Sequence, residues 1–172
     1  MILTVTINPL LERRYFFPRV FPRKGNRNGR VELTAGGKGI NISRQLNNLK
    51  IENLSFTFLG GTNGKLLKDL LFKEKINFTS VKTVNETRDA ALIFNESDKS
   101  LTTFFGSNTI ITEKESVEFK SKLEKIIQNS EMVVFSGSSP CTAADSIFPF
   151  GIEAANKYDK ISVCDTYGNH LK

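Results

Sequence analysis

Short apolar segments alternate with amphipathic segments along this chain, and the alternation limits the folds that the chain can adopt. ILTVTI (2–7), LSFTFLG (54–60), MVVFSGS (132–138) and ISVCDT (161–166) are rich in β-branched and aromatic residues, which favours buried strands. Strands that alternate with helices predict parallel βαβ units with right-handed crossovers. The carboxyl ends of such strands lie at one edge of the sheet, where open α/β sheets bind ligands.

Helical spacing of apolar residues marks the segments between these strands. The predicted helices cover residues 40–49, 64–75, 113–128 and about 143–158. Thr112 and Glu115 form a capping-box pattern that opens the third helix. Its apolar residues Val117, Phe119, Leu123, Ile126 and Ile127 are expected to face inward. Pro149 is expected to delay or kink the fourth helix, because proline lacks the backbone N–H that a helix interior uses.

Two further regions predict extended structure. YFFPRVF (15–21) and GRVELT (29–34) flank a turn-rich segment. Pro18 and Pro22 confine the first piece to an edge strand or a projecting ribbon. Residues 76–84 are expected to form a short strand. Residues 90–95 and 100–105 alternate around a polar turn, which predicts a hairpin.

Composition narrows the possible functions. The net charge is +6, but the basic residues are scattered and only residues 13–30 are one-sidedly basic, so nucleic acid is a weakly supported partner. No apolar run reaches 18 residues and the chain does not start like a signal peptide, so no membrane partner is expected. Cys141, Cys164 and the single His170 lie far apart, which argues against a zinc site or a disulfide framework. A reducing, cytoplasmic location is expected.

The glycine-rich stretch GGKGIN (36–41) is the most distinctive motif. It lacks the spacing of a dinucleotide fingerprint and the G-K-S/T of a Walker A loop. Two interpretations remain. The backbone could let a ligand approach a helix N-terminus that favours anions, with the Asn41 amide matched to vicinal sugar hydroxyls. Alternatively, the stretch is a plain glycine-rich entry to a helix.

Other polar residues stand at the predicted ends of strands. Asn8, Gly60-Gly61, Ser136-Gly137-Ser138 and Asp165 all follow strand runs and are expected to converge at one sheet edge. Glu12, Arg27 and Arg88 are charged residues near strands or turns. Each of the three, taken alone, is equally explained as a solvated surface charge.

The order of these motifs resembles the ribokinase-like (PfkB) sugar kinase family, in the branch that contains 1-phosphofructokinase and tagatose-6-phosphate kinase. The resembling segments are ILTVTINPLLERRYF, GNR, AGGKGINISRQLNNL, FLGGTNGKLLKDLL, ETRDAALI, SGSSP and VCDTYG. The resemblance implies the N-terminal part of a three-layer αβα sandwich, with a mostly parallel sheet, over residues 1–172. It also implies a projecting β-lid with segments at about 13–34 and 76–105, which pairs with the lid of a second copy in a homodimer.

The resemblance also implies roles for individual residues. Glu12 replaces a family aspartate that hydrogen-bonds sugar hydroxyls, and Gly36, Gly37, Lys38 and Asn41 would floor the sugar pocket. Arg88, with Arg27 from the lid, would hold the phosphate of a phosphorylated hexose, and Ser138 would lie beside the same pocket. Asp165 would lie near the metal. The family reaction transfers a phosphoryl group from ATP with the help of magnesium.

The sequence departs from the family at several points. The N-x-x-E and G-A-G-D motifs of the family's second half, the latter with the catalytic aspartate, do not occur, so no catalytic residue is predicted. Glu12 is longer than aspartate, and Lys50 stands where the family usually has glycine. FFGSN (104–108) and SSPCT (138–142) also differ.

These departures define the expected function. We expect a sugar-phosphate-binding half of a hexose-phosphate kinase, for tagatose-6-phosphate or fructose-1-phosphate, that is inactive alone. One alternative is a non-catalytic binding or regulatory module that pairs with an intact homologue. The other is a non-functional gene fragment.

Overall fold

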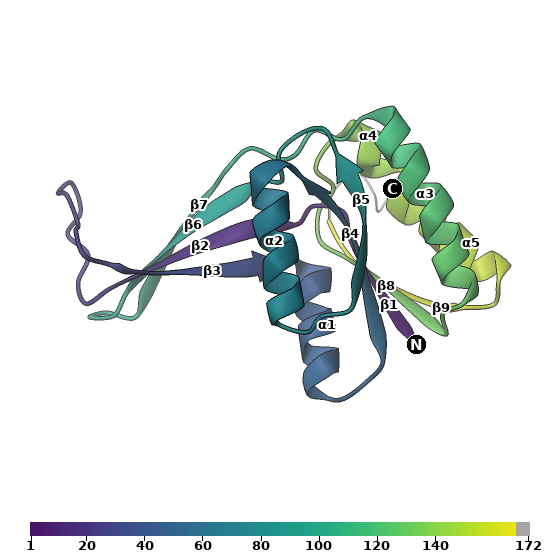
Figure 1. Ribbon diagram of the computed structural model, residues 1–172, viewed down its shortest axis with the longest axis horizontal. Coiled ribbons are helices and arrows are strands. Elements are labelled where there is room, and N and C mark those ends of the chain that lie inside the picture. The colour runs from purple at the N-terminus through teal and green to yellow at the C-terminus, as the bar shows by residue number, and fades with distance from the viewer. Residues whose placement is uncertain (168–172) are drawn as a thin grey trace.

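A five-stranded parallel sheet forms the centre of the computed structural model, which describes residues 1–167 (Figure 1). In spatial order its strands are β5 (Phe78–Thr83), β4 (Asn53–Gly60), β1 (Ile2–Thr6), β8 (Met132–Ser136) and β9 (Ile161–Asp165). Every neighbouring pair runs parallel. The predicted parallel α/β sheet is therefore confirmed, while His170 and the last residue of VCDTYG lie outside the described residues.

Helices cover both faces of this central sheet. One face carries α1 (Lys38–Asn48) and α2 (Gly61–Lys73), and the other carries α3 (Glu113–Gln128), α4 (Thr142–Asp145) and α5 (Ile147–Lys157) (Figure 1). The predicted fourth helix is interrupted at Ser146, because Pro149 has no N–H to donate to the carbonyl of Asp145. Within residues 1–167, no helix combines the length and the apolar character needed to cross a membrane.

The start of α3 has the predicted capping box. The Thr112 side chain accepts from the backbone N–H of Glu115 at 3.3 Å, and the Glu115 carboxylate accepts from the backbone N–H of Thr112 at 2.8 Å. The inward-facing prediction is wrong for Val117, which is 64% exposed. Two residues along a helix are about 200° apart, so Val117 faces solvent when Phe119 faces the sheet.

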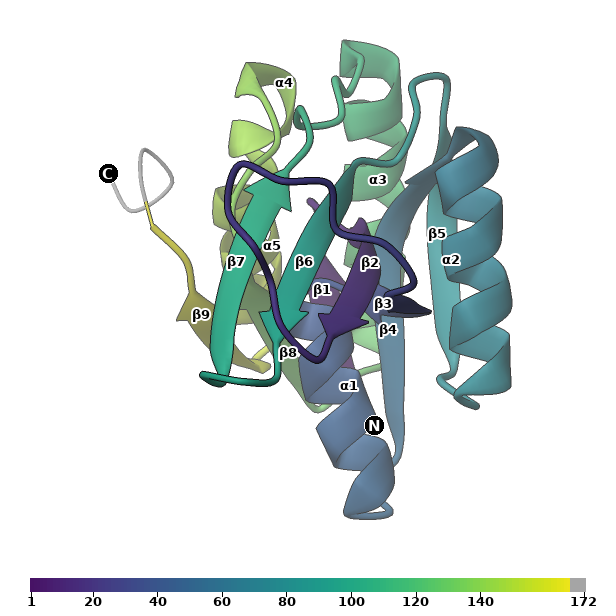
Figure 2. The same ribbon diagram turned by 90° about the vertical axis from the view of Figure 1, so that its left-hand side faces the viewer.

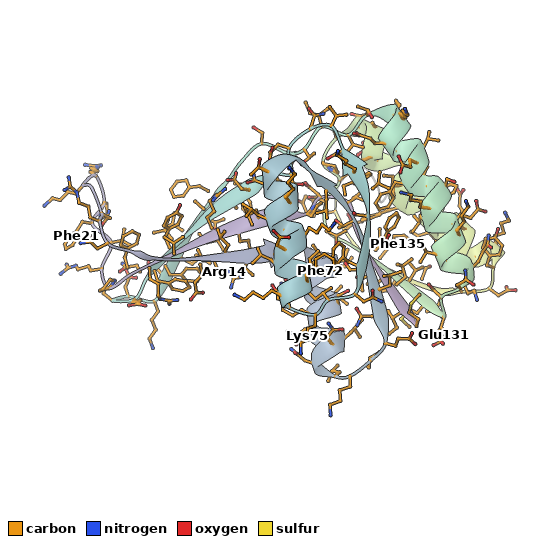
Figure 3. All side chains as sticks on the ribbon, viewed as in Figure 1. Arg14, Phe21, Phe72, Lys75, Glu131 and Phe135 are labelled. Atoms are coloured by element: carbon orange, nitrogen blue, oxygen red, sulfur yellow. The ribbon has the colours of Figure 1, made fainter. Side chains whose placement is uncertain are left out.

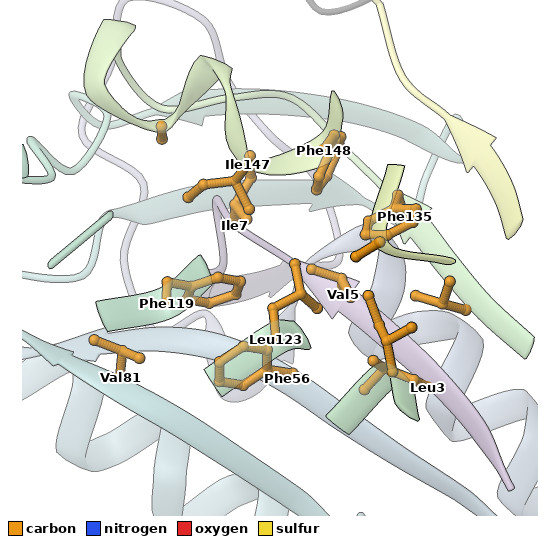
Figure 4. Close-up of a cluster of buried hydrophobic side chains, with 14 of the residues drawn as sticks. Leu3, Val5, Ile7, Phe56, Val81, Phe119, Leu123, Phe135, Ile147 and Phe148 are labelled. Carbon is orange, nitrogen blue, oxygen red and sulfur yellow. The ribbon is translucent and has the colours of Figure 1, made fainter. Parts of the chain in front are cut away.

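The larger hydrophobic core lies between the central sheet and the layer of α3 and α5 (Figure 4). Phe119 is at its centre, with ring centroids 3.9 Å from Phe56 and 4.3 Å from Phe58. A smaller core lies under α1 and α2 on the opposite face, formed by Ala35, Ile40, Leu59, Leu67, Leu71 and Ile76. Both faces of the sheet are therefore buried, as expected for a parallel sheet.

A second, four-stranded sheet extends away from the central one (Figures 1 and 2), and we call it the projecting sheet. Its spatial order is β3 (Arg30–Gly36), β2 (Leu10–Phe17), β6 (Asp89–Asn95) and β7 (Ser100–Phe105). The predicted hairpin of β6 and β7 is confirmed. This sheet occupies the position of the predicted lid.

The boundaries of the projecting sheet differ from the prediction in two respects. Residues 78–83 pair with β4 in the central sheet, so the second segment of the projecting sheet begins at Asp89 and not at 76. β2 begins at Leu10 and is an interior strand between β3 and β6. Pro18 follows its last residue, so the proline ends the strand and does not force it to an edge.

Candidate functional site

Polar side chains from four segments of the chain meet beyond the carboxyl ends of β1 and β8. Asn8 Nδ2 donates to Ser138 Oγ at 3.1 Å and to Asn108 Oδ1 at 3.2 Å. Arg88 donates to the same Asn108 oxygen at 2.9 Å, and its other terminal nitrogen donates to the backbone carbonyl of Asn8 at 3.3 Å. The predicted convergence of Asn8 and Ser138 at this edge is confirmed, and the structure adds Arg88 and Asn108 to the group.

Arg88 differs from most other arginines in its partners. Four arginines form ion pairs with carboxylates: Arg13, Arg14, Arg30 and Arg44. Within residues 1–167, Arg88 forms none, and its guanidinium lies 5.8 Å from the centroid of the Phe105 ring. Burial lowers the pKa of Arg88 below its usual value, and the charge of Tyr167 partly opposes this shift. Because a guanidinium stays charged at physiological pH, the result is a half-buried cation without a counter-charge.

Two buried polar atoms in this group lack a hydrogen-bond partner within the described residues, 1–167. Arg88 Nε is an unsatisfied donor, and Asn8 Oδ1 is an unsatisfied acceptor. Buried polar groups are nearly always paired in folded proteins, so an unpaired donor and an unpaired acceptor in one network indicate a bound molecule or water.

The GGKGIN motif forms the entry to α1 beside this group. Gly37 is the N-cap with φ 133°, a conformation that favours glycine. A Cβ at Gly36 would lie 2.6 Å from Glu12 Oε1, so the missing side chain leaves room for that carboxylate. Lys38 Nζ lies 3.3 Å from Asp165 Oδ2, which also accepts from Ser136 Oγ at 3.1 Å. The motif therefore places α1 against the ends of β8 and β9.

Glu12 lies on β2 and is mostly buried, with 14% of its side chain exposed. Its Oε2 accepts two hydrogen bonds from Arg14, at 2.9 Å from Nε and 2.6 Å from Nη2 (Figure 3 labels Arg14). Oε1 faces Gly36, and among residues 1–167 no side chain or backbone group donates a hydrogen bond to it. The sequence prediction did not include Arg14, although residues two apart on a strand share a face.

Asn41 is exposed in the first turns of α1, and its side-chain oxygen accepts from Arg44 Nη1. Arg44 also donates to Glu74 Oε2 at 2.6 Å and to the backbone carbonyl of Ala35 at 2.7 Å. The sequence prediction missed Arg44 as well. Its spacing of three residues from Asn41 on a helix could have revealed the contact.

The structure does not bring Arg27 to Arg88 within one chain. At the start of β2, the Leu11 N–H donates to the backbone carbonyl of Arg88 at 3.0 Å, whereas Arg27 lies in the loop beyond the opposite end of β2. At about 3.3 Å per residue, β2 separates these two ends by roughly 20 Å. Arg27 can therefore reach such a site only on a second copy or after movement of the projecting sheet.

The other predicted positions have different neighbours. Asp165 meets Ser136 and Gly137 at this sheet edge, as predicted, with Ser136 Oγ donating to its Oδ2 at 3.1 Å and the Gly137 N–H donating to its backbone carbonyl at 3.0 Å. Gly61 faces the Glu86 carboxylate and lines a hollow of about 740 Å³ between α2 and β5, which Glu12, Asn41 and Arg88 do not line. The Asp165 carboxylate also faces the Lys38 ammonium, with 3.3 Å between Oδ2 and Nζ. Among residues 1–167, no cluster of three or more His, Cys, Asp or Glu side chains could hold a metal ion. One carboxylate facing an ammonium is not a magnesium site by itself.

Comparison with known proteins places this geometry in context. The family model described as pfkB family carbohydrate kinase matches residues 6–170. A tagatose-6-phosphate kinase of Staphylococcus epidermidis is 30% identical over the whole chain, which spans 55% of that relative. A crystal structure of a possible 1-phosphofructokinase from Thermotoga maritima superposes with a TM-score of 0.92 at 27% identity, over 99% of this chain and 55% of that one. The crystal structure of phosphofructokinase-2 from Escherichia coli in complex with fructose-6-phosphate superposes with a TM-score of 0.90 at 25% identity. The match covers 99% of this chain and 56% of that one.

Proposed function

The chain belongs to the pfkB family of carbohydrate kinases, and from that premise we propose that it binds a phosphorylated hexose at the carboxyl edge of its central sheet. Its fold is the ribokinase-like α/β fold of these phosphofructokinases. The observation that supports the proposal most directly is Arg88, a half-buried cation that has neither a carboxylate partner nor a partner for its Nε among residues 1–167. A phosphate ester supplies both the negative charge and the acceptor oxygens that this group lacks.

The remaining site residues suit the hydroxyl groups of the sugar. Glu12 Oε1 is an acceptor beside Gly36, and the Asn41 amide lies one turn into α1. The entry to α1 at Gly37 and Lys38 adds the partial positive charge of a helix N-terminus. Ser138, hydrogen-bonded to Asn8, borders the Arg88 group. We propose tagatose-6-phosphate or fructose-1-phosphate as the ligand.

We assign substrate binding to this chain and not phosphoryl transfer. It spans about half the length of the curated relatives that it matches, and the N-x-x-E and G-A-G-D motifs do not occur in its 172 residues. ATP would supply the phosphoryl group and magnesium would neutralise its charge in a complete family enzyme. Asp165 could contribute at most one ligand to such a metal. A cytoplasmic location also remains a prediction.

A ligand panel tests the proposal. We expect tagatose-6-phosphate or fructose-1-phosphate to stabilise the chain by about 2.7 kcal/mol at a hundredfold excess over Kd, because a ligand that binds only the folded state shifts the unfolding equilibrium. Fructose-6-phosphate belongs in the panel because one relative binds it. Unphosphorylated tagatose and inorganic phosphate are the controls. A chain that unfolds cooperatively and is stabilised by none of the phosphorylated sugars would contradict the proposal.

The projecting sheet supports a second part of the proposal, which is assembly with a second copy. Strand register places Glu12 and a set of apolar residues on the same face of this sheet: Phe16, Leu92, Phe94, Leu101 and Phe105. Leu101 and Phe105 are 51% and 67% exposed. Exposed apolar patches of this kind mark interaction surfaces. We propose that two copies pair through this face, or that an intact homologue presents the same face to this chain.

Leu101→Lys is expected to raise the dimer dissociation constant at least about tenfold, because a lysine would bury its charge in an apolar contact. Sedimentation velocity over a range of protein concentrations measures this change. The control is Val117→Lys, which places the same charge on an exposed apolar position of α3. Unchanged dimerisation of the Leu101→Lys variant, or a monomeric wild-type chain, would contradict pairing of two copies. The second result would leave an intact homologue as the partner.

A further inference from the structure

Arg44 connects three elements behind the proposed sugar site. Its side chain donates from α1 to Glu74 at the C-cap of α2, to the backbone carbonyl of Ala35 on β3, and to the side-chain oxygen of Asn41 on α1 itself. The Arg44 and Glu74 side chains are each 26% exposed. Three partners in three directions hold the guanidinium in one orientation, because its donors form a rigid planar fork.

The contact with Arg44 decides which end of the Asn41 amide faces outward. Arginine has five donors and no acceptor, so the Asn41 atom that faces it must be the carbonyl oxygen. The amide nitrogen of Asn41, with its two N–H donors, is then left for a ligand. An asparagine without this contact could present either its donors or its acceptor.

We propose that Arg44 is a positioning residue that fixes Asn41 as a hydrogen-bond donor to the substrate. This inference rests on the proposed function of the site. Glu12 Oε1 lies beside Gly36, and Asn41 stands in the first turn of α1, where its backbone N–H donates to the carbonyl of Gly37 at 2.9 Å. One oxygen of Glu12 is occupied by Arg14, and the other can only accept. In this proposal a sugar hydroxyl accepts a hydrogen bond from the Asn41 amide and donates one to Glu12. The hydroxyl then acts both as acceptor and as donor.

This arrangement predicts that the site binds a sugar phosphate with a free hydroxyl at this position more tightly than an analogue in which that hydroxyl is absent or methylated. A deoxy sugar phosphate would leave the Asn41 donor and the Glu12 acceptor unpaired, and an O-methyl ether would lose the hydrogen that Glu12 accepts. Sites that bury polar groups for a hydroxyl reject analogues without it, because those groups then remain unsatisfied. If the Asn41 amide were inverted, its oxygen and the Glu12 carboxylate would both face one hydroxyl as acceptors. The hydroxyl has a single hydrogen and could donate to only one of them.

The first test uses the ligand-free chain. The Asn41 side-chain amide signal in a ¹⁵N NMR spectrum is assigned by its loss in Asn41→Asp. We expect its order parameter to fall below about 0.6 in Arg44→Lys, since a single ammonium cannot span three partners. The matched control is Arg13→Lys, because Arg13 also bonds one carboxylate and one asparagine, Asp89 and Asn63. An equally ordered Asn41 amide in Arg44→Lys would overturn the inference.

The second test measures the affinity for tagatose-6-phosphate by calorimetry, in a double-mutant cycle. Arg44→Lys is expected to weaken binding about three- to tenfold, and to have no further effect in an Asn41→Ala background, because it acts through Asn41. Asn41→Asp keeps the contact with Arg44 but exchanges donors for an acceptor, so it should weaken binding at least about tenfold. Additive losses in the cycle would show a merely structural role for Arg44.

The two tests separate this inference from the function on which it rests. A wild-type chain that binds no phosphorylated sugar but whose Asn41 amide loses order in Arg44→Lys would contradict the proposed function and support the positioning role of Arg44. Binding that is abolished by Arg88→Ala but unaffected by Asn41→Asp would support the phosphate site and overturn the donor role of Asn41.

Discussion

Replacing Phe119 with alanine is expected to lower the free energy of unfolding by about 3–5 kcal/mol. The ring is fully buried and lies between Phe56 and Phe58, with centroid distances of 3.9 and 4.3 Å. Its removal leaves a cavity between α3 and the central sheet, where neighbouring side chains relax only partly. Urea unfolding monitored by circular dichroism measures the change. A domain of this kind has about 5–15 kcal/mol in total, so the variant should be close to its limit of stability.

A matched control separates the core from the helix that carries it. Val117→Ala on the same helix removes an apolar side chain that is 64% exposed, and it is expected to change the free energy of unfolding by less than about 0.5 kcal/mol. Similar losses for the two variants would mean that α3 does not pack with its Phe119 face toward the sheet. If Phe119→Ala prevents folding altogether, Phe119→Leu offers a smaller cavity with the same direction of effect.

Replacing Arg88 with alanine is expected to weaken the binding of a phosphorylated hexose about 30- to 1,000-fold, which corresponds to about 2–4 kcal/mol. Arg88 is the half-buried cation of the site, and neither its Nε nor the nearby Asn8 Oδ1 has a hydrogen-bond partner in the part of the chain that the structure describes. A phosphate would form charge-assisted hydrogen bonds with this guanidinium, and an alanine can form none. Isothermal titration calorimetry of the two proteins measures the difference.

Two comparisons make the Arg88 result specific. Arg88→Lys keeps the charge but loses the two-pronged geometry, so we expect affinity between that of the wild type and that of Arg88→Ala. The stability of Arg88→Ala should stay near the wild-type value, because the substitution also removes a desolvated charge. Equal affinity of wild type and Arg88→Ala for the phosphorylated sugar would place the phosphate elsewhere, with Lys38 as the next basic side chain at this edge.

The candidate site was predictable from the sequence in some parts and not in others. Strand ends such as Asn8 and Ser138 follow local apolar runs, so their meeting at one sheet edge followed from the βαβ pattern. The roles of Glu12, Arg88 and Asn41 came from the resemblance to a family, and they stay proposals. Arg14, Arg44 and Asn108 were missed, because their importance arises from contacts with other side chains.

Arg27 and residues 76–84 show the limit most clearly. Both belong to the segments that the family resemblance assigned to a lid, at about 13–34 and 76–105. The pairing of β5 with β4 moves 78–83 into the central sheet, and the register of β2 and β6 sets Arg27 and Arg88 at opposite ends of a strand. No local pattern distinguishes a strand of one sheet from a strand of the other.

The sequence by itself determined the type and the order of most elements, because helix caps, apolar periodicity and proline positions act over a few neighbouring residues. Only the tertiary structure decided which strands pair, which charges remain without a partner, and which contacts hold the Arg44 guanidinium in place. These features depend on residues that are distant in the chain, such as Leu11 with Asp89 and Arg44 with Glu74. Hydrogen bonds and ion pairs of this kind are short-ranged, so they are set only when packing brings the side chains together.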